Sequence, residues 1–597
     1  MILQSLLDLY ERRCASEDPE QWLPEPGWQE KEIAFVIDLS QDGRPIAVHD
    51  LRQPQPKGRP RAPQRLVPQE HKRPGKIPDE PTENDAWKAF LLWDNPKYAL
   101  GVAADDDPKT LKDAATCHGL FKIRNKSFLG GLSDPGARTL KSFLDSDVPK
   151  SIRAIVNDGS WEEMRRSGGN ITFRLSNATE LICRRPAVRA AITSAASQPE
   201  DALPPAGCIV SGKFGPIARL HPAIKGVRGA QPSGADIVSF NLPAFKGYGF
   251  DQGDNAPIST YAAFAYTTAL NALLARDSGH RGQAGNVTVA FWAGRASPNE
   301  QVICPFLAAV AHDDPGRRSF DVQALYSAPV TGARPCTEDD TPYLILGLSA
   351  ESKSRLTVRF FHQGTIKEAA RNIIAWHEAL RIASEDGPPL SIHRLLRGLA
   401  VRGEIDNAPA LLGAELLRCA YTGAAFPQRV LAEALVRCAA ERGPTRERAA
   451  LIKAFLIRNC RRRVPVELDP EEADTAYRLG RLFAVLEWVQ EHAVNAKAGI
   501  AERYWGSAST TPAFVFADLL NLTVHHLAKL DGTQPGFATN RRKEIETIVA
   551  ALPTKLPTRL ELIDQGSFAI GYWQQRAARR PATDKAVATD GAEKDAA

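Results

Sequence analysis

Two short segments of the chain contain residue types that could perform hydrolytic chemistry. Residues 207–213 fit the GxxxxGK pattern of a phosphate-binding loop. Such a loop requires a Ser or Thr hydroxyl after the lysine, which binds Mg²⁺, and a helix whose N-terminus faces the phosphates. Here Phe214 occupies the hydroxyl position, and the Gly-Pro pair that follows it disfavours a helix. A nucleotide hydrolase built on this loop is therefore an alternative and not the expected function.

The second segment is the His-Asp doublet at residues 312–313, a pair also found in metal-dependent phosphohydrolases. Those sites need further His and Asp ligands on neighbouring helices. The other histidines are scattered, and the adjacent pair His525 and His526 would point about 100° apart on a helix. The nine cysteines form no CxxC pair and are odd in number, which predicts reduced, mostly buried thiols. We expect no catalytic residue, no metal site and no cofactor.

The strongest pattern for binding lies in the glycine-rich segment 211–260. Glycine lets the backbone approach a ligand closely, Lys and Arg neutralise phosphates, and Asn and Gln hydrogen-bond to base edges. The segment also holds an aromatic-glycine cluster, Tyr248-Gly249-Phe250. The alternative is a set of surface loops that bind nothing, in which Arg219 and Arg228 form ion pairs that lock the loops. The candidate nucleic-acid-binding residues here are Lys213, Arg219, Lys225, Arg228, Gln231, Asn241, Lys246, Gln252 and Asn255.

Three other stretches are basic. Residues 51–78 hold seven prolines and eight Lys/Arg residues against one acid, which predicts an extended basic loop. Residues 121–128 (FKIRNKSF) are also basic, and residues 442–463 hold eight basic side chains against one acid. Such a run is either a solvated face or a track for phosphates, and both alternatives stay open. The candidates from these stretches are Lys72, Arg73, Lys76, Lys122, Arg124, Lys126, Arg458, Arg461 and Arg462.

The elements that would position these residues change in type along the chain. Residues 31–50 contain two apolar runs around Asp42-Gly43, which predicts a β-hairpin. Residues 262–274 predict a buried helix. Further strands of one mixed sheet are predicted at 286–293, 343–348 and 355–361. Helices are predicted at 366–383, 391–401, 409–420, 428–441, 445–462, 470–495, 513–530, 540–552 and 558–578.

One of these helices shows a clear apolar stripe. Its residues are spaced as one helix face and predict the core of a helical bundle. The stripe is formed by Leu479, Leu482, Phe483, Leu486, Val489 and Ala493.

Together the patterns predict an α+β protein. We expect a mixed α/β body with hairpins and long basic loops over residues 1–375, an all-α bundle over 376–578 and a disordered tail over 579–597. The composition is 43% hydrophobic and 24% charged with a net charge of +5, which is typical of a globular protein. Because we find no leader and no long apolar run, we expect a soluble cytoplasmic protein.

Several long segments resemble one known family. They include MILQSLLDLY at the start, FLLWDNPKYALG (90–101), YGFDQGDNAPIS (248–259) and QGSFAIGYWQQR (565–576). GPIARLHPAIKGVRGAQPSGADIVSFN (215–241) belongs to the same set. These segments resemble the type I-C CRISPR-associated large subunit of the Cascade interference complex, from Met1 to about Arg576. The chain departs from the family pattern by extra residues at 79–89, so loop contacts do not transfer directly to Lys72, Arg73 or Lys76.

The resemblance implies a non-enzymatic subunit of the RNA-guided Cascade complex in antiviral defence. Such a subunit recognises the protospacer-adjacent motif (PAM) in duplex DNA, promotes strand opening and R-loop formation, and helps to recruit the helicase-nuclease. Its partners are CRISPR RNA, target double-stranded DNA with its displaced single strand, and the backbone, guide-processing and small subunits. The C-terminal helices resemble the small subunit. A purely structural scaffold remains an alternative, beside the P-loop-like nucleotide hydrolase.

From this resemblance and the local chemistry we expect one contact with the PAM and the duplex. It would be built from Lys72, Arg73, Lys76, Arg219, Lys225, Arg228, Gln231, Asn241 and Gln252.

Overall fold

The computed structural model describes residues 1–55, 58, 60–71, 73, 77–78, 80–197, 202–311, 336–383, 390–409, 411–494 and 499–579. Lys72, Lys76, the doublet at 312–313 and residues 580–597 lie outside the described residues. The chain divides into two compact units. The first is Met1–Lys225 with Pro232–Ala272, and the second is Gly226–Gln231 with Leu273–Ala597. The domain limits inferred from the sequence stay predictions.

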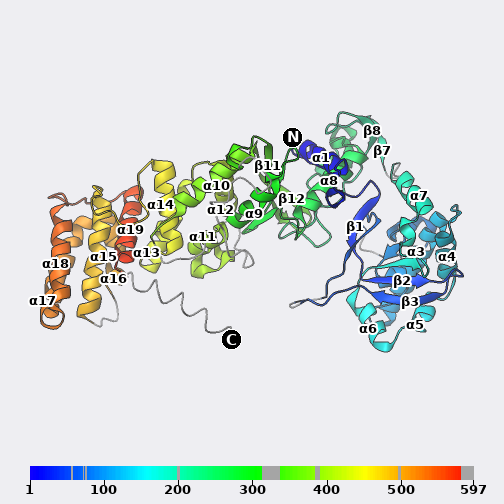
Figure 1. Cartoon of the computed structure of the whole chain (residues 1–597), viewed down its shortest axis with the longest axis horizontal. Coiled ribbons are helices and arrows are strands. Elements are labelled where there is room, and N and C mark those ends of the chain that lie inside the picture. The colour runs from blue at the N-terminus through cyan, green and yellow to red at the C-terminus, as the bar shows by residue number, and fades with distance from the viewer. Residues whose placement is uncertain are drawn as a thin grey trace. The chain divides into compact units, whose positions relative to one another are not determined.

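The central sheet of the first unit has the strand order β3-β2-β6-β5. Strands β2 (Phe35–Leu39) and β3 (Pro45–Asp50) form the predicted hairpin, and Gly43 in its turn has a φ of 90°. Strand β6 (Ile171–Leu175) pairs parallel to β2, and the short β5 (Trp93–Asp94) pairs antiparallel to β6. Figure 1 shows β2 and β3 beside the helices of this unit.

Part of the predicted basic loop is a strand. Strand β4 (Gln64–Pro68) pairs antiparallel with β1 (Trp28–Glu32) in a separate two-stranded sheet. The prediction of an extended loop over 51–78 is therefore wrong for these five residues. Proline is tolerated here because β4 has only one neighbouring strand, so its other edge needs no backbone donor.

Helices α2 (Pro96–Ala99), α3 (Pro108–Leu129), α4 (Pro135–Asp145), α5 (Val148–Arg153), α6 (Asp158–Ser167) and α7 (Pro186–Ser197) complete this part of the first unit. Several begin after an Asp or Asn whose side chain accepts hydrogen bonds from the first backbone amides, the usual N-terminal cap. Asp107, Asp134 and Asp147 are examples. The apolar faces of sheet and helices bury Trp93, Phe121, Phe143 and Phe173 completely.

The remaining first unit is built around α8 (Thr260–Leu274), which confirms the predicted buried helix. Helix α1 (Ile2–Cys14) packs against it through Tyr10, whose ring makes edge contacts with Tyr261 and Phe264. Strands β7 (Leu203–Gly207) and β8 (Phe214–Ile217) form a small hairpin. Between β8 and α8 the chain runs as glycine-rich loops with short 3-10 turns at Pro243–Phe245, Gly247–Gly249 and Gln252–Asn255.

The second unit contains a four-stranded sheet in the order β12-β11-β10-β9. Its strands are β9 (Arg281–Ala284), β10 (Val287–Ala293), β11 (Pro342–Ser352) and β12 (Arg355–Thr365), and helix α9 (Asn299–Ala311) follows β10. The prediction that the last three strands share a sheet is confirmed. The prediction that the sheet is mixed is wrong, because every pairing is antiparallel. Short turns after β9 and β11 reverse the chain, as antiparallel hairpins require.

The helices of this unit follow the predicted ranges closely. They are α10 (Ile366–Leu380), α11 (Ile392–Leu399), α12 (Leu412–Thr422), α13 (Gln428–Glu441), α14 (Arg446–Cys460), α15 (Thr475–Ala493), α17 (Phe516–Thr533), α18 (Pro535–Ala550) and α19 (Leu562–Ala577). Helix α16 (Ile500–Thr510) was not predicted, because its GSASTT sequence lacks apolar periodicity. In Figure 1 helices α15, α17, α18 and α19 lie side by side.

One continuous hydrophobic core joins the sheet to these helices. The stripe on α15 is buried as predicted, with Leu479, Leu482 and Phe483 fully inaccessible.

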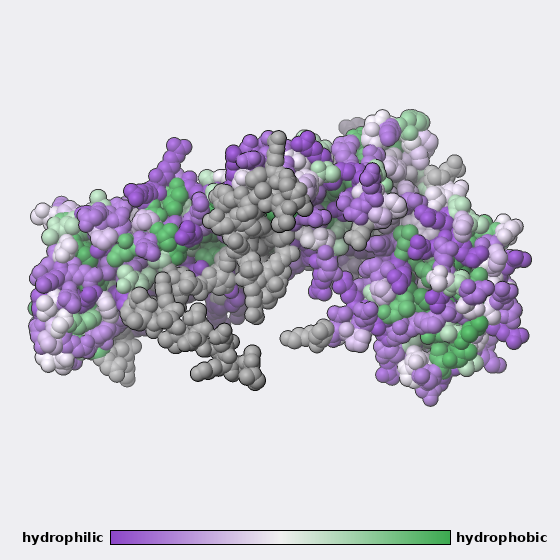
Figure 2. Space-filling model, viewed as in Figure 1, coloured by the Kyte–Doolittle hydropathy of each residue, from purple (hydrophilic) through white to green (hydrophobic). Residues whose placement is uncertain are grey.

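Figure 2 shows that hydrophilic residues cover most of the visible face, broken by smaller hydrophobic patches. The α+β class is confirmed. Within the described part of the chain, we find no helix with the length and apolar character that a membrane span requires.

Candidate nucleic-acid interface

The GxxxxGK segment is the turn of the β7–β8 hairpin. The amide of Cys208 donates to the carbonyl of Lys213 at 2.9 Å, and the amide of Gly212 donates to the carbonyl of Cys208 at 2.9 Å. Phe214 begins strand β8 where a phosphate loop would begin a helix. These two amides therefore close the turn and are not available to a phosphate, and the turn has no helix N-terminus that could bind one.

Lys213 nonetheless extends from this turn as an exposed cation. Its side chain has no ion-pair partner among the described residues. Phe214 beside it is 78% exposed, which is unusual for a large aromatic residue. The turn thus presents a positive charge and an aromatic ring together, a combination suited to phosphates and bases.

Three other predicted residues contact one another at the 3-10 turn Gln252–Asn255. The Arg219 guanidinium donates to Oε1 of Gln252 at 2.8 Å, and the Asn255 side chain donates to the Gln252 carbonyl at 3.1 Å. Gln252 has a φ of 46°, in the left-handed region. A capping box between Asp251 and Asp254 encloses the same turn. These contacts fix the shape of the loop, and Gln252 uses its amide oxygen within the protein.

The loop before this turn is the most exposed part of the region. Asn241, Lys246 and Tyr248 are all exposed, and Phe250 is 51% exposed. The ammonium of Lys246 lies 3.4 Å from Asp251. The sequence drew attention to the aromatic-glycine cluster, but it did not place Tyr248 or Phe250 among the candidate binding residues. Their exposure could not be read from residue type, since aromatic residues are more often buried.

Lys225 connects the glycine-rich segment to the basic segment 51–78. Its ammonium contacts Glu70, whose second oxygen lies 2.5 Å from the ammonium of Lys31. Burial opposes ionisation of Glu70, but the two lysines outweigh it and hold the pKa of this carboxyl below its ordinary value. Burial lowers the pKa of Lys31, whose ammonium also lies 5.4 Å from the Trp93 ring centroid. Glu70, the single acid of the basic segment, therefore joins Lys31 of strand β1 to Lys225 of the glycine-rich segment.

Arg73 is held inside the first unit. Its guanidinium pairs with Asp94 and lies 3.5 Å from the ring centroid of Phe90 and 4.0 Å from that of Tyr98. Asp94 also accepts hydrogen bonds from the amides of Phe90 and Asn95. Burial raises the pKa of Asp94 to about 6, although Arg73 and these amides act in the other direction. Arg73 thus supports strand β5 and the start of α2 from inside the unit.

The three candidates on α3 also bind to their own chain. Lys122 donates to the Ser146 carbonyl at 3.2 Å, and Lys126 pairs with Asp145. Arg124 donates to the carbonyl of Trp87 at 2.6 Å. Burial lowers the pKa of Lys122. These contacts tie α3 to the segments before and after it.

Arg228 and Gln231 belong to the six-residue segment of the second unit. The Arg228 amide donates to Oγ1 of Thr288 at 3.1 Å, and its guanidinium donates to the Gly285 carbonyl at 3.0 Å. The Gln231 amide donates to the carbonyl of Lys353 at 2.8 Å. The segment is thereby fixed to the β9–β10 and β11–β12 turns, while the Arg228 side chain remains exposed.

A comparison with protein families decides the relationship of the chain. A family model described as CRISPR-associated protein (Cas_Csd1) matches residues 6–580. The chain belongs to the Cas_Csd1 family. This match confirms the resemblance drawn from the sequence, and it identifies a CRISPR-associated protein of a Cascade complex with other subunits. No curated protein matches the chain at a significant level of similarity.

The arginine-rich segment 442–463 of this Cas_Csd1 chain is largely engaged in internal contacts. On α14, Arg448 donates to the Gly398 carbonyl at 2.8 Å, Lys453 to the Ala379 carbonyl at 3.2 Å, and Arg458 to the Cys419 carbonyl at 3.1 Å. These carbonyls lie in the last turns of α11, α10 and α12, where a helix has unsatisfied acceptors and a negative dipole end. Helix α14 therefore caps three neighbouring helices with its basic side chains.

Two further arginines of the segment are paired. Arg462 lies 2.7 Å from Asp474 and also contacts Asp564, and Arg442 lies 3.2 Å from Glu502. Arg461, which has a φ of 54°, and Arg463 are exposed and have no ion pair within the described residues. Of the predicted candidates in this segment, only Arg461 extends into solvent.

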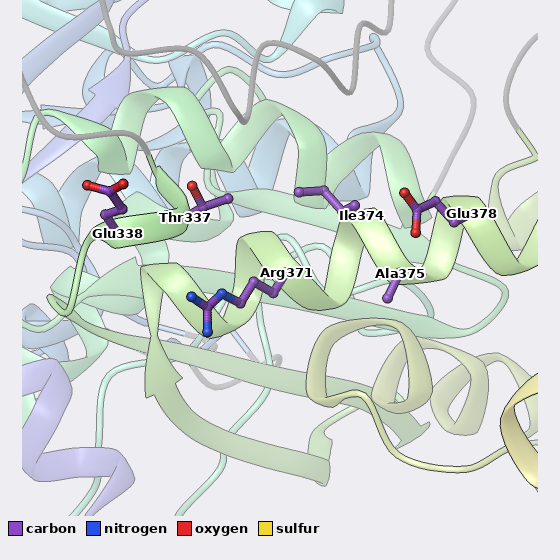
Figure 3. A pocket seen from close by; sticks show the side chains of 6 residues that line it. All are labelled: Thr337, Glu338, Arg371, Ile374, Ala375 and Glu378. Carbon is purple, nitrogen blue, oxygen red and sulfur yellow. The ribbon is translucent and has the colours of Figure 1, made fainter.

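A cleft of about 430 Å³ lies between the 3-10 turn Cys336–Glu338 and α10. Figure 3 shows Arg371, Ile374, Ala375 and Glu378 on α10, with Thr337 and Glu338 on the turn. Its lining mixes both charges with apolar groups and offers no set of metal ligands. Elsewhere in the described residues we find no group of three or more His, Cys, Asp or Glu side chains that could hold a metal ion.

Proposed function

We propose that the chain is the non-catalytic large subunit of a type I-C RNA-guided surveillance complex. In this proposal it recognises the PAM in duplex DNA, promotes strand opening and R-loop formation, and helps to recruit the helicase-nuclease. Guide RNA pairing would supply most of the sequence recognition, so the protein needs only a short readout of the duplex and a basic surface. Membership of the Cas_Csd1 family supports this assignment.

The observation that supports DNA contact best is the exposed surface of the glycine-rich loops. Lys213, Asn241 and Lys246 are exposed beside aromatic side chains, and the loops beneath them are fixed by internal hydrogen bonds. A preformed surface loses little conformational entropy on binding. Lysines on such a surface position the phosphates, and amide side chains can distinguish base edges.

Lys225 has a different part in this proposal. Its side chain is 41% exposed and already paired with Glu70, so a phosphate would compete with a carboxylate for it. We expect Lys225 to contribute less to DNA affinity than Lys213, whose charge has no partner among the described residues. In both cases the contribution should fall as salt concentration rises.

The experiment assembles the complex with guide RNA and its other subunits, with and without this chain. Binding is measured to a library of duplexes that share the target but carry randomised flanking bases, at two salt concentrations. We expect selection of particular flanks only when the chain is present. If the complex without the chain selects the same flanks equally well, the chain is a structural scaffold and the proposed function fails.

A further inference from the structure

We propose that Tyr248, with Phe250 beside it, is a stacking surface for one unpaired base of the target DNA. This inference rests on the proposed function and assigns strand opening to a particular side chain. Tyr248 is 102% exposed, whereas Tyr266, Tyr343, Tyr421 and Tyr572 are fully buried. A ring this exposed makes no packing contact in its own subunit, so both of its faces are open to another molecule.

The backbone holds Tyr248 in an unusual conformation. Its φ and ψ are 57° and 23°, in the left-handed region that non-glycine residues rarely adopt. Gly247 and Gly249 flank it, and a Cβ added at either glycine would meet nothing within 4 Å. The two glycines therefore leave the ring without neighbouring side chains, so that a flat ligand can approach it.

The loop that carries the ring is stabilised at its base. Phe240 and Phe245 pack edge to face with ring centroids 5.6 Å apart. The amide of Phe245 donates to the Leu242 carbonyl at 3.0 Å, and that of Phe250 donates to the Gly247 carbonyl at 3.1 Å. A ring on a stabilised loop can stack on a base without a further loss of loop entropy.

The surroundings favour a nucleic acid over a protein partner. Lys246 lies two residues before Tyr248 and is exposed, with a loose contact of 3.4 Å to Asp251 that a phosphate would have to displace, and Asn241 is an exposed amide on the same loop. Glycines separate the aromatic residues here, so they do not form the large continuous apolar patch that marks many protein-docking surfaces. Bases of any identity offer a π face, and lysine supplies the charge for the phosphate of the same nucleotide.

The test compares Tyr248→Ala, Tyr248→Phe and the control Phe514→Ala in assembled complexes. Phe514 is 71% exposed in the second unit and serves as a matched aromatic residue. The rate of R-loop formation is followed with 2-aminopurine placed beyond the first pairs, on a fully paired target and on a target already mismatched in the first pairs beside the PAM. We expect Tyr248→Ala to slow opening of the paired target about tenfold. On the mismatched target the variant should recover most of the wild-type rate, because the first pairs beside the PAM are already separated.

Tyr248→Phe should behave like the wild type, since phenylalanine retains the stacking face. Phe514→Ala should also behave like the wild type, because Phe514 lies outside the glycine-rich loop. Equal loss on paired and mismatched targets, or an equal defect in Tyr248→Phe, would overturn the inference. Loss of another subunit from the Tyr248→Ala complex during size-exclusion chromatography would show a protein contact instead. If Tyr248→Ala is fully active while PAM selection still requires the chain, only this inference fails. If PAM selection does not require the chain, the proposed function fails as well.

Discussion

The glycine-rich segment 211–260 has five basic residues, whereas the shorter segment 442–463 has eight. Charge density alone would favour the second as the DNA-binding surface. In the structure Arg448 and Lys453 of the second segment are only 3% and 2% exposed, while Lys213 and Lys246 of the first are exposed. The segment with fewer charges therefore exposes the larger share of them, three of five (Lys213, Arg228, Lys246) against three of eight (Arg442, Arg461, Arg463).

The reason for this difference is the secondary structure around each segment. Helix α14 lies among helices whose final carbonyls need donors, and arginine supplies five donors in a fixed geometry. The glycine-rich loops satisfy their backbone groups locally, so that their lysines are not required as caps. Basic residues in a helical bundle should first be tested as structural groups before they are assigned to nucleic acid.

Replacing Arg448 should produce the largest effect and should separate the two segments most clearly. Arg448→Ala removes the hydrogen bond to Gly398 and the ion pair with Glu441. Glu441 is 38% exposed and keeps Arg437 as a partner, so the cost is that of the charge-assisted hydrogen bond and the packing of the buried Arg448 side chain, about 3 kcal/mol of unfolding free energy. Chemical denaturation of the purified chain measures the loss, with Arg461→Ala as the exposed control. A fully stable Arg448→Ala protein that binds DNA poorly would show that the segment is a binding surface after all.

Lys453 should make stability depend on alkaline pH. Burial lowers its pKa to about 8, below the 10.5 of an exposed lysine. Because the folded-state pKa is depressed, its contribution to stability is complete above pH 10.5 and is lost as the pH falls through 8. The difference in unfolding free energy between wild type and Lys453→Met should therefore change by about 3 kcal/mol between pH 10.5 and 7. A difference that stays constant with pH would mean that Lys453 is solvated.

His221 should make the first unit sensitive to acid. Burial lowers its pKa to about 4, and Nδ1 lies 2.6 Å from the Tyr266 hydroxyl. A histidine that folds in the neutral form contributes stability above pH 6.5, and this contribution is lost as the pH falls through 4. Thermal unfolding followed from pH 7 to 4 should show a loss of about 3 kcal/mol that His221→Gln lacks. Identical pH profiles for both proteins would exclude His221 as the cause.

Lys213 should give the smallest effect, confined to DNA binding. Lys213→Ala should weaken binding of the assembled complex to all duplexes by about threefold and reduce the log–log salt slope by about one, as expected for one phosphate contact. Lys543→Ala is the control, because Lys543 is an exposed lysine on α18. Unfolding curves of both variants should match the wild type. An unchanged salt slope for Lys213→Ala would remove Lys213 from the phosphate contacts.

The sequence predicted those features that depend on neighbours along the chain. The Asp42-Gly43 turn located the β2–β3 hairpin, and the apolar period of α15 located the bundle core. It did not predict α16, whose Ser and Thr residues resemble a loop. It also placed β4 in a loop, because the prolines of segment 51–78 suit an edge strand as well as a loop.

Contacts between distant residues could not be predicted. Arg73 pairs with Asp94, and Lys225 pairs with Glu70, 155 residues away. Arg448 and Arg458 also donate to backbone carbonyls, which residue type does not reveal. For the same reason the predicted candidates divide in the structure into groups that bind within the protein, such as Arg124, and groups that face solvent, such as Lys213.

The most direct measurement is crosslinking of the assembled complex to its target DNA with short-wavelength light, followed by mass spectrometry of the crosslinked peptides. We predict crosslinks within residues 211–260, at or beside Lys213 and Tyr248. Crosslinks confined to residues 442–463, with none in the glycine-rich loops, would contradict the account.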